Sequence, residues 1–182
     1  EDDAILVINK PVGLVTHPGA GIADNTLMNG LLYHCPDNKL IPRAGIVHRL
    51  DKAASGLMIV AKNQNSFEHL KRQFINRKVK KVYTSLVYGS LINDFGKIDF
   101  KIARSKTRGH MVARPSQSDQ EGKEAITHYD VLKRLKTTTL VKASIETGRT
   151  HQIRVHFFAI DHPVVGDTIY KKRHMKNIRP IE

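Results

Sequence analysis

The sequence predicts an α+β fold, a mixed and mainly antiparallel sheet with flanking helices. Two observations carry this prediction. Apolar segments with strand-like alternation outnumber segments with helical spacing. Several of these strands also follow one another with only short turns between them, which favours antiparallel pairing over the helical crossovers that a parallel sheet needs. The 182 residues, 40% of them hydrophobic, are enough for one domain with a substantial core.

Each element has a local signal in the sequence. Thr26 caps a short helix with Leu27 and Leu31 inward, and Asn65 or Ser66 caps an amphipathic helix. Thr150 caps a third helix that runs to about Ala159. The polar, turn-rich stretch 105–124 is predicted to be a long loop. Strands are expected at residues 4–8, 57–61, 82–88, 98–102, 126–132, 139–145 and 168–170.

Charge is the strongest compositional feature of the chain. Lys and Arg number 30 and Asp and Glu 17, which leaves a net charge of +13. The basic residues gather at positions 62–83, 101–114 and 171–179, so we expect a polyanionic partner, nucleic acid before membrane. Aromatic residues make up only 6% and Trp is absent, so folded RNA gripped through its backbone fits better than a stacking platform for single strands.

Other classes of protein are disfavoured by what the sequence lacks. No apolar run reaches 18 residues, so neither a transmembrane helix nor a secretory signal is expected. Cys35 is the only cysteine, which suits a reducing compartment, and we expect a cytoplasmic protein. His151, His156 and His162 do not share a helical face and no thiolate or carboxylate set accompanies them, so we expect no metal.

Three polar segments interrupt the apolar pattern. Residues 45–56 place His48, Arg49 and Asp51 between two apolar strands, and this segment is either an ordinary loop in which Asp51 caps a turn or a catalytic loop. Tyr83 lies within a strand, where a packed aromatic side chain is the plain interpretation. Residues 146–154 run from a strand end into a helix N-terminus, which is either a simple capped helix or an anion site with two arginines.

The order and content of these segments resemble the RluA-type pseudouridine synthases. His48-Arg49-Leu50-Asp51 followed by Ser55-Gly56-Leu57 resembles their catalytic motif, and Asn9-Lys10-Pro11 with Gly13-Leu14 resembles their opening motif. Tyr83 with Leu86-Val87 and Gly89 resembles the motif of the active-site tyrosine. Residues 148–156, followed by His162-Pro163 and Gly166-Asp167, resemble the third motif.

This resemblance implies a reaction and a set of residues. The enzyme would isomerise uridines of RNA, most of all large-subunit ribosomal RNA, to pseudouridine, as a monomer without a cofactor. Asp51 would be the catalytic carboxylate, Arg154 would orient it, and Tyr83 would stack on the uracil. Arg49 would enter the RNA stack when the target base flips out. The residues expected to bind the RNA substrate are Arg49, His48, Lys10, Arg149, His151, Lys71 and Arg72.

The resemblance also implies how the chain is organised. Residues 1–182 are expected to be one catalytic domain, truncated at both ends, since an S4-like N-terminal domain and the closing strands are not among them. Ala54 stands where the family usually has Thr, so a hydroxyl that supports the catalytic loop is missing.

Two other functions compete with the synthase at this point. An RNA-binding module without chemistry would explain the charge equally well, although it has no need of Asp51 in a basic groove. A hydrolase would need a second carboxylate, for which no partner is obvious among the motif residues.

Overall fold

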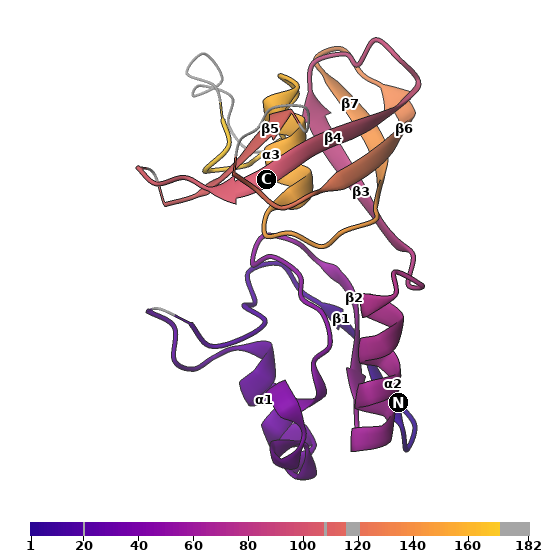
Figure 1. Ribbon diagram of the computed structural model, residues 1–182, viewed down its shortest axis with the longest axis vertical. Helices are drawn as coiled ribbons and strands as arrows, with labels where there is room; N and C mark the ends of the chain where they lie inside the picture. Colours follow the sequence, from indigo (N-terminus) through magenta and orange to yellow (C-terminus); the bar gives the residue numbers. More distant parts are fainter. Residues whose placement is uncertain (20, 108, 116–120, 172–182) are drawn as a thin grey trace. The chain divides into compact units, whose positions relative to one another are not determined.

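The computed structural model describes all residues except 20, 108, 116–120 and 172–182 (Figure 1). The chain folds into two compact units, Glu1–Val79 and Lys80–Glu182. Each unit has its own sheet and its own apolar core. The assignment of both units to one catalytic domain stays a prediction.

The first unit is built on a two-stranded antiparallel ribbon. Strand β1 (Ile5–Lys10) pairs along its whole length with β2 (Gly56–Ala61), close to the two strands that the sequence predicts. Helix α2 (Gln64–Ile75) covers one side of this ribbon by burying Phe67 and Leu70 against Ala61. Between the strands, the chain forms α1 (Leu27–His34) and the 3₁₀ turns η1 (Pro36–Leu40) and η2 (Pro42–Gly45).

The helix caps of this unit follow from short polar side chains. Thr26 caps α1 as expected, and Leu27 and Leu31 are buried. Helix α2 begins earlier than predicted: the cap is Asn63, whose Oδ1 accepts a hydrogen bond of 2.9 Å from the Ser66 amide. The prediction of Asn65 or Ser66 as the cap was wrong because Asn63 is already extended and reaches the third amide of the helix.

The second unit is a five-stranded sheet in the order β3-β7-β6-β4-β5, in which every pair of neighbours is antiparallel. Helix α3 (Gln152–Ala159) packs on one face and buries Phe157 against Val87, Val141 and Ala143 (Figure 1). The strands are β3 (Lys81–Tyr88), β4 (Phe95–Arg104), β5 (Met111–Pro115), β6 (Ile126–Arg134) and β7 (Thr138–Ile145). The predicted fold class, α+β with mainly antiparallel pairing, is confirmed.

Three local predictions for this unit were wrong. Strand β5 lies inside the stretch 105–124, because Met111 and Ala113 pair with β4 and pack beside Val155 of α3. Residues 168–170 form no strand. The ring of Tyr170 is buried in the apolar core, and this burial rather than sheet pairing explains the apolar residue at this position. Helix α3 is not capped by Thr150, since the chain enters it through His151 in the left-handed conformation, with φ of 56°. Among the described residues, no helix is long and apolar enough to cross a membrane.

One buried amide ties the first unit together. Asn38, 1% exposed, donates from Nδ2 to the carbonyl oxygens of Ala44 (2.9 Å) and Ala61 (3.0 Å). These contacts bring the turn η2 against the end of β2. Gly45 makes this approach possible because its φ is +81° and a Cβ there would collide with the Ala61 carbonyl oxygen.

We therefore expect Gly45→Ala to destabilise the protein by about 2–4 kcal/mol, through overpacking against backbone and a strained positive φ. Urea unfolding monitored by circular dichroism measures the loss. The matched control is Gly30→Ala in the exposed middle of α1, where a Cβ meets nothing within 4 Å and helix propensity favours Ala. Equal stabilities of the two variants would contradict this account of Gly45.

Candidate active site

The loop that carries Asp51 is held by hydrogen bonds to its backbone carbonyls on both sides of that residue. The Leu50 carbonyl accepts 3.0 Å from the Thr16 hydroxyl, and the Lys52 carbonyl accepts 2.7 Å from the Gly13 amide. The Ala54 amide closes a turn onto the carbonyl of Asp51 itself at 3.1 Å. Leu50 is buried and Asp51 is half-buried. The segment that follows β1 thus fixes the loop that precedes β2.

Lys10 is fully buried where β1 ends, in the same unit as Asp51. Its ammonium donates to the carbonyl oxygens of Pro11 (2.8 Å) and Leu14 (2.9 Å). Burial lowers the pKa of Lys10, and the negative charge of Asp51 opposes that shift. The ammonium therefore braces the turn after β1 and places a positive charge within electrostatic reach of the candidate carboxylate.

His48 links the same loop to the ribbon and to α2. Its Nε2 accepts a hydrogen bond of 3.0 Å from the Ile59 amide, so the ring carries its proton on Nδ1 when neutral. The ring stacks on Phe74 of α2 with centroids 4.8 Å apart. The expected role of His48 in binding RNA stays a prediction, and its contacts here fix the start of the loop that carries Asp51.

Several predicted RNA-binding cations of the first unit are exposed. Arg49 is exposed, and so are Lys71 and Arg72 on the outer side of α2, as predicted for residues that contact RNA. Burial, together with the positive charges of Arg43 and Arg49, lowers the pKa of His17. The buried Nε2 of His17 has no hydrogen-bond partner in the part of the chain that the structure describes.

In the second unit, Tyr83 lies on β3 opposite Ala143 of β7 and is half-buried. Side chains alternate along a strand, so Tyr83 shares a face with Val87, and this is the face on which α3 packs. The tyrosine therefore lies on the helix-covered side of the sheet.

Arg154 of α3 makes a two-pronged ion pair with Asp167. Its Nε donates to Oδ2 at 2.6 Å and its Nη2 to Oδ1 at 2.9 Å, and the two side chains are 17% and 2% exposed. Burial alone raises the pKa of Asp167, but the hydrogen bonds from Arg154 and from the Tyr170 and Ile169 amides outweigh it and hold the pKa below its usual value. The sequence analysis did not assign Asp167 to Arg154, although Asp167 belongs to a quoted motif, and the expected role of Arg154 in orienting Asp51 stays a prediction.

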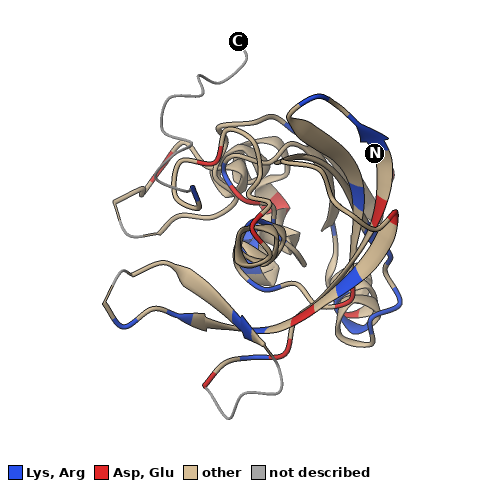
Figure 2. Ribbon diagram, turned by 90° about the horizontal axis from the view of Figure 1, so that it is seen from above, with Lys and Arg blue, Asp and Glu red and all other residues tan. Residues whose placement is uncertain are grey.

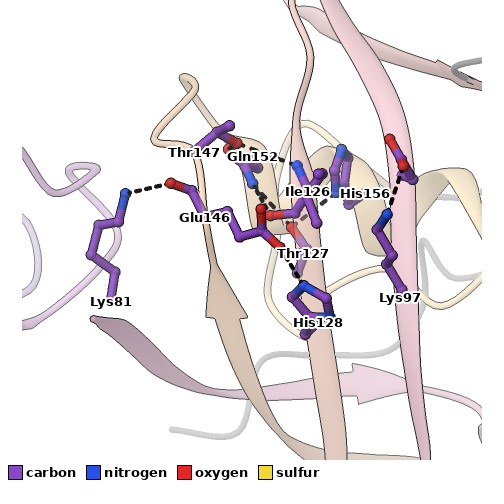
Figure 3. Close-up of polar contacts among 10 residues, drawn as sticks. Lys81, Lys97, Ile126, Thr127, His128, Glu146, Thr147, Gln152 and His156 are labelled. Atoms are coloured by element: carbon purple, nitrogen blue, oxygen red, sulfur yellow. Dashed lines mark hydrogen bonds and ion pairs between the residues drawn. The ribbon is translucent and has the colours of Figure 1, made fainter. Parts of the chain in front are cut away.

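The turn before α3 is held by the buried side chain of Gln152 (Figure 3). Its Oε1 accepts from the Thr147 hydroxyl at 2.8 Å and from the Arg149 amide at 3.0 Å. Its Nε2 donates to the Ile126 carbonyl at 2.9 Å and to the Thr127 hydroxyl at 3.2 Å. The amide thus uses all of its ordinary hydrogen-bonding capacity to join the β7–α3 turn to β6.

His156, one turn further along α3, is completely buried beside this network. Nε2 faces the Phe100 carbonyl at 3.1 Å and Nδ1 faces the Thr127 hydroxyl at 2.9 Å, so the ring donates from Nε2 and accepts at Nδ1. Burial lowers the pKa of His156 to about 4, although the Phe100 carbonyl and Asp99 act in the opposite direction. The ring is neutral at physiological pH and joins α3 to β4 and β6.

Two other predicted residues lie at the start of α3. Arg149 donates from Nε to the Glu124 carbonyl at 3.0 Å, and the Nδ1 of His151 lies 3.0 Å from the Tyr170 hydroxyl. Nearby on the sheet, Glu146 pairs with His128 at 2.7 Å (Figure 3). The second unit thus gathers Arg149, His151 and Arg154 around one helix N-terminus.

A metal has one conceivable set of ligands among the described residues, Glu1, His34 and Cys35. Glu1 already pairs there with His34 at 2.8 Å and with the Lys62 ammonium at 3.0 Å. The lysine supplies the compensating charge and would oppose a bound cation, so these side chains do not fit a metal well.

Comparison with known proteins defines the class. The sequence model of the RNA pseudouridylate synthase family matches residues 4–159, which include most of both units and every predicted catalytic residue. The chain belongs to this family.

Individual relatives give a narrower comparison than the family model does. The chain is 49% identical over 174 residues to ribosomal large subunit pseudouridine synthase D of Pseudomonas aeruginosa, covering 95% of this chain and 52% of that protein. Identity to the enzyme of the same name from Neisseria meningitidis is 48% over 170 residues, covering 93% and 44%. The chain spans about half the length of these relatives.

Solved structures support the same family. Human RNA pseudouridylate synthase domain containing 1 superposes with a TM-score of 0.80 at 31% identity, covering 99% of this chain and 71% of that one. Human RNA pseudouridylate synthase domain containing 4 gives a TM-score of 0.75 at 27% identity, covering 95% and 68%.

The lowered pKa of His156 predicts a stability that depends on pH. The unfolded chain takes up a proton below about pH 6.5 and the folded chain only below about pH 4, so the contribution is complete above 6.5 and is lost as the pH falls from 6.5 to 4. The expected loss from this residue is about 3 kcal/mol. Urea unfolding at pH 7.5 and 4.5 measures it against His156→Asn, which keeps an acceptor and a donor. Parallel pH profiles of the two proteins would remove His156 as the cause.

Proposed function

We propose that the protein converts specific uridines of RNA to pseudouridine and that large-subunit ribosomal RNA is its substrate. Membership of the RNA pseudouridylate synthase family carries the proposal, together with the similarity to enzymes named for the large ribosomal subunit. The loop that bears Asp51, held by hydrogen bonds to its backbone carbonyls on both sides, supports it. A cytoplasmic place of action and a monomeric enzyme without metal or cofactor belong to the same proposal.

The reaction is an isomerisation. The N1–C1′ bond of the uridine breaks, the uracil turns, and C5 joins C1′, while the proton of C5 leaves and N1 ends with a proton. Atoms and electrons balance within the nucleotide, so no oxidant or group donor is needed. What the reaction needs is a carboxylate near the sugar carbon, a group that manages the C5 proton, and a site that holds the flipped base.

The residues divide these tasks in our proposal. Asp51 acts as the nucleophile or as the charge stabiliser, through attack at C1′, attack at C6 or a glycal route. Tyr83 stacks on the uracil and assists removal of the C5 proton. Arg154 orients Asp51 through charge-assisted hydrogen bonds.

The remaining basic residues serve the RNA. Arg49, exposed beside Asp51, fills the gap in the RNA stack left by the flipped base and offsets an unstacking cost of a few kcal/mol. Five more residues are proposed to contact the RNA: Lys71, Arg72, Arg149, His48 and His151. The buried Lys10 acts indirectly, by bracing the turn after β1. Lys and Arg occur on several elements of both units (Figure 2), and the cluster 171–179 lies almost entirely outside the described residues.

The deciding experiment is incubation of the full-length protein with ribosomal and transfer RNA, followed by chemical mapping of pseudouridine. New pseudouridine in large-subunit RNA supports the proposal. Binding of RNA without any new pseudouridine would favour an RNA-binding module without chemistry.

Asp51→Asn should abolish this isomerisation by several orders of magnitude and leave RNA affinity nearly intact. An amide keeps the shape of the side chain but cannot act as an anion, and it changes one charge on a protein with a net charge of +13. Single-turnover assays and RNA titration measure the two effects. The neighbour Lys52→Gln is a control for a charge change in the same loop. Retention of more than a small fraction of the wild-type rate would remove Asp51 from its role.

RNA binding should weaken steeply with salt, because phosphate contacts carry it. If about five to seven phosphates are neutralised, log K falls with log salt at a slope of about −4 to −6. Charge reversal of Lys71, Arg72 and Lys78 should make the slope shallower, and reversal of Lys133, Lys136 and Lys142 makes the same change in net charge elsewhere. Filter binding over a salt series measures both. An unchanged slope in the first variant would take α2 out of the interface.

A further inference from the structure

Arg154 is fixed along one edge by a carboxylate that the sequence analysis did not assign to it. The Nε and Nη2 groups donate to the two oxygens of Asp167 at 2.6 and 2.9 Å. Asp167 also accepts at Oδ1 from the amides of Ile169 (2.8 Å) and Tyr170 (2.9 Å), and its side chain is only 2% exposed. The backbone amides of the following turn therefore fix the Asp167 carboxylate independently of its pair with Arg154.

The face of the guanidinium is fixed as well. The ring of Tyr170 lies 5.1 Å from the central carbon of the Arg154 guanidinium, within the range of a cation–π contact. Tyr170 is itself held in place, since it is only 2% exposed. Its hydroxyl accepts a hydrogen bond of 3.1 Å from the Met111 amide, and the hydroxyl oxygen lies 3.0 Å from the Nδ1 of His151. One edge and one face of Arg154 thus rest on a rigid surface.

This geometry determines which hydrogen bonds Arg154 can offer to other groups. A guanidinium has five N–H groups arranged in two forks. Asp167 occupies the fork of Nε and Nη2, so the side-on grip that arginine commonly uses for phosphate is already taken. The fork of Nη1 and Nη2 is the one that the pair with Asp167 does not use.

We propose that Asp167 is a positioning residue of the active site, which together with Tyr170 sets the plane and reach of the Arg154 guanidinium. Arg154 then acts as an oriented donor toward the catalytic carboxylate and not as a mobile cation that grips the RNA backbone. The inference rests on the proposed function, because it assigns Asp167 a role through a residue of that reaction.

The physical advantage is preorganisation. An arginine side chain has many rotamers in solution, and each productive hydrogen bond costs part of that freedom. The ion pair fixes the rotamer before the substrate arrives, so that no reorganisation is needed during the reaction. A displacement of about 1 Å at such a group costs about 10²-fold in rate.

The test is a double-mutant cycle with Asp167→Asn, Arg154→Lys and the double variant, in the full-length protein. Single-turnover rates at saturating enzyme and RNA dissociation constants are measured for each. Asp167→Asn should lower the rate about 10²-fold and change RNA affinity less than about threefold. The double variant should be no slower than Arg154→Lys alone, because Asp167 acts only through the guanidinium.

A matched control separates positioning from general stability. Asp94→Asn removes another Arg–Asp pair of the same unit, the one between Asp94 and Arg134. Arg134 is the last residue of β6, whereas Gln152 of α3 contacts the first residue of that strand. It should leave the single-turnover rate unchanged. Should Asp167→Asn fold poorly, Asp167→Glu keeps the charge and shifts the carboxylate by one methylene. The side-chain Nε–H resonance of Arg154, measured by NMR, then reports whether the arginine has lost its fixed partner.

Each outcome has one meaning. If the wild-type protein forms no pseudouridine, the proposed function fails, whatever the NMR signal of Arg154 shows. If the wild type is active and folded Asp167→Asn keeps its rate, or if the losses of the two single variants multiply in the double variant, the positioning role of Asp167 is wrong. If Asp167→Glu leaves both the single-turnover rate and the Arg154 resonance unchanged, the positioning role of Asp167 is also wrong.

Discussion

The ion pair between Arg154 and Asp167 is the contact on which the arrangement of the second unit's site residues depends. It joins α3 to the turn at residues 167–170, and both side chains are largely withdrawn from water. Removing one partner of a buried pair typically costs about 3–5 kcal/mol, because the other charge is left without compensation. The pair is therefore maintained in the fold whether or not substrate is present, and Tyr170, which packs on it, carries the constraint to His151 and β5.

Neutral polar groups near this charged pair join α3 to the sheet by hydrogen bonds. Gln152, Thr127 and His156 form a chain in which the amide donates to the hydroxyl and the hydroxyl donates to the imidazole. Such a chain is stable only when every member is satisfied, and the Phe100 carbonyl completes it at the far nitrogen. In the first unit, Asn38 has the same function between η2 and β2. In each unit, a buried amide thus adds to apolar packing by holding a turn against the sheet.

Much of the fold could be predicted from local sequence patterns, because strand alternation and a cap such as Thr26 are properties of a few adjacent residues. The first failures were also local: Asn63 caps α2 from two residues before the expected position, and His151 enters α3 with a positive φ. The partner of Arg154 could not be found in this way. Asp167 is 13 residues away, and only the packing of α3 against the following turn brings the two side chains together. Motif order indicated that both residues matter, while the contact between them is a property of the tertiary structure.

In the proposed function, the division between buried and exposed cations separates the residues that shape the site from those that contact RNA. Lys10 is buried with its ammonium on two carbonyls, and Arg154 is paired with Asp167, so neither side chain is placed to meet a polyanion as an exposed cation would be. Lys71, Arg72 and Arg49 are exposed, and their charges act on a polyanion before contact is made. Substitution of an exposed cation should therefore affect encounter and salt dependence, whereas a buried one should affect the geometry of the reacting groups. In the proposed function, the net charge of +13 attracts the RNA, and the buried ion pair and amides keep the site residues in place.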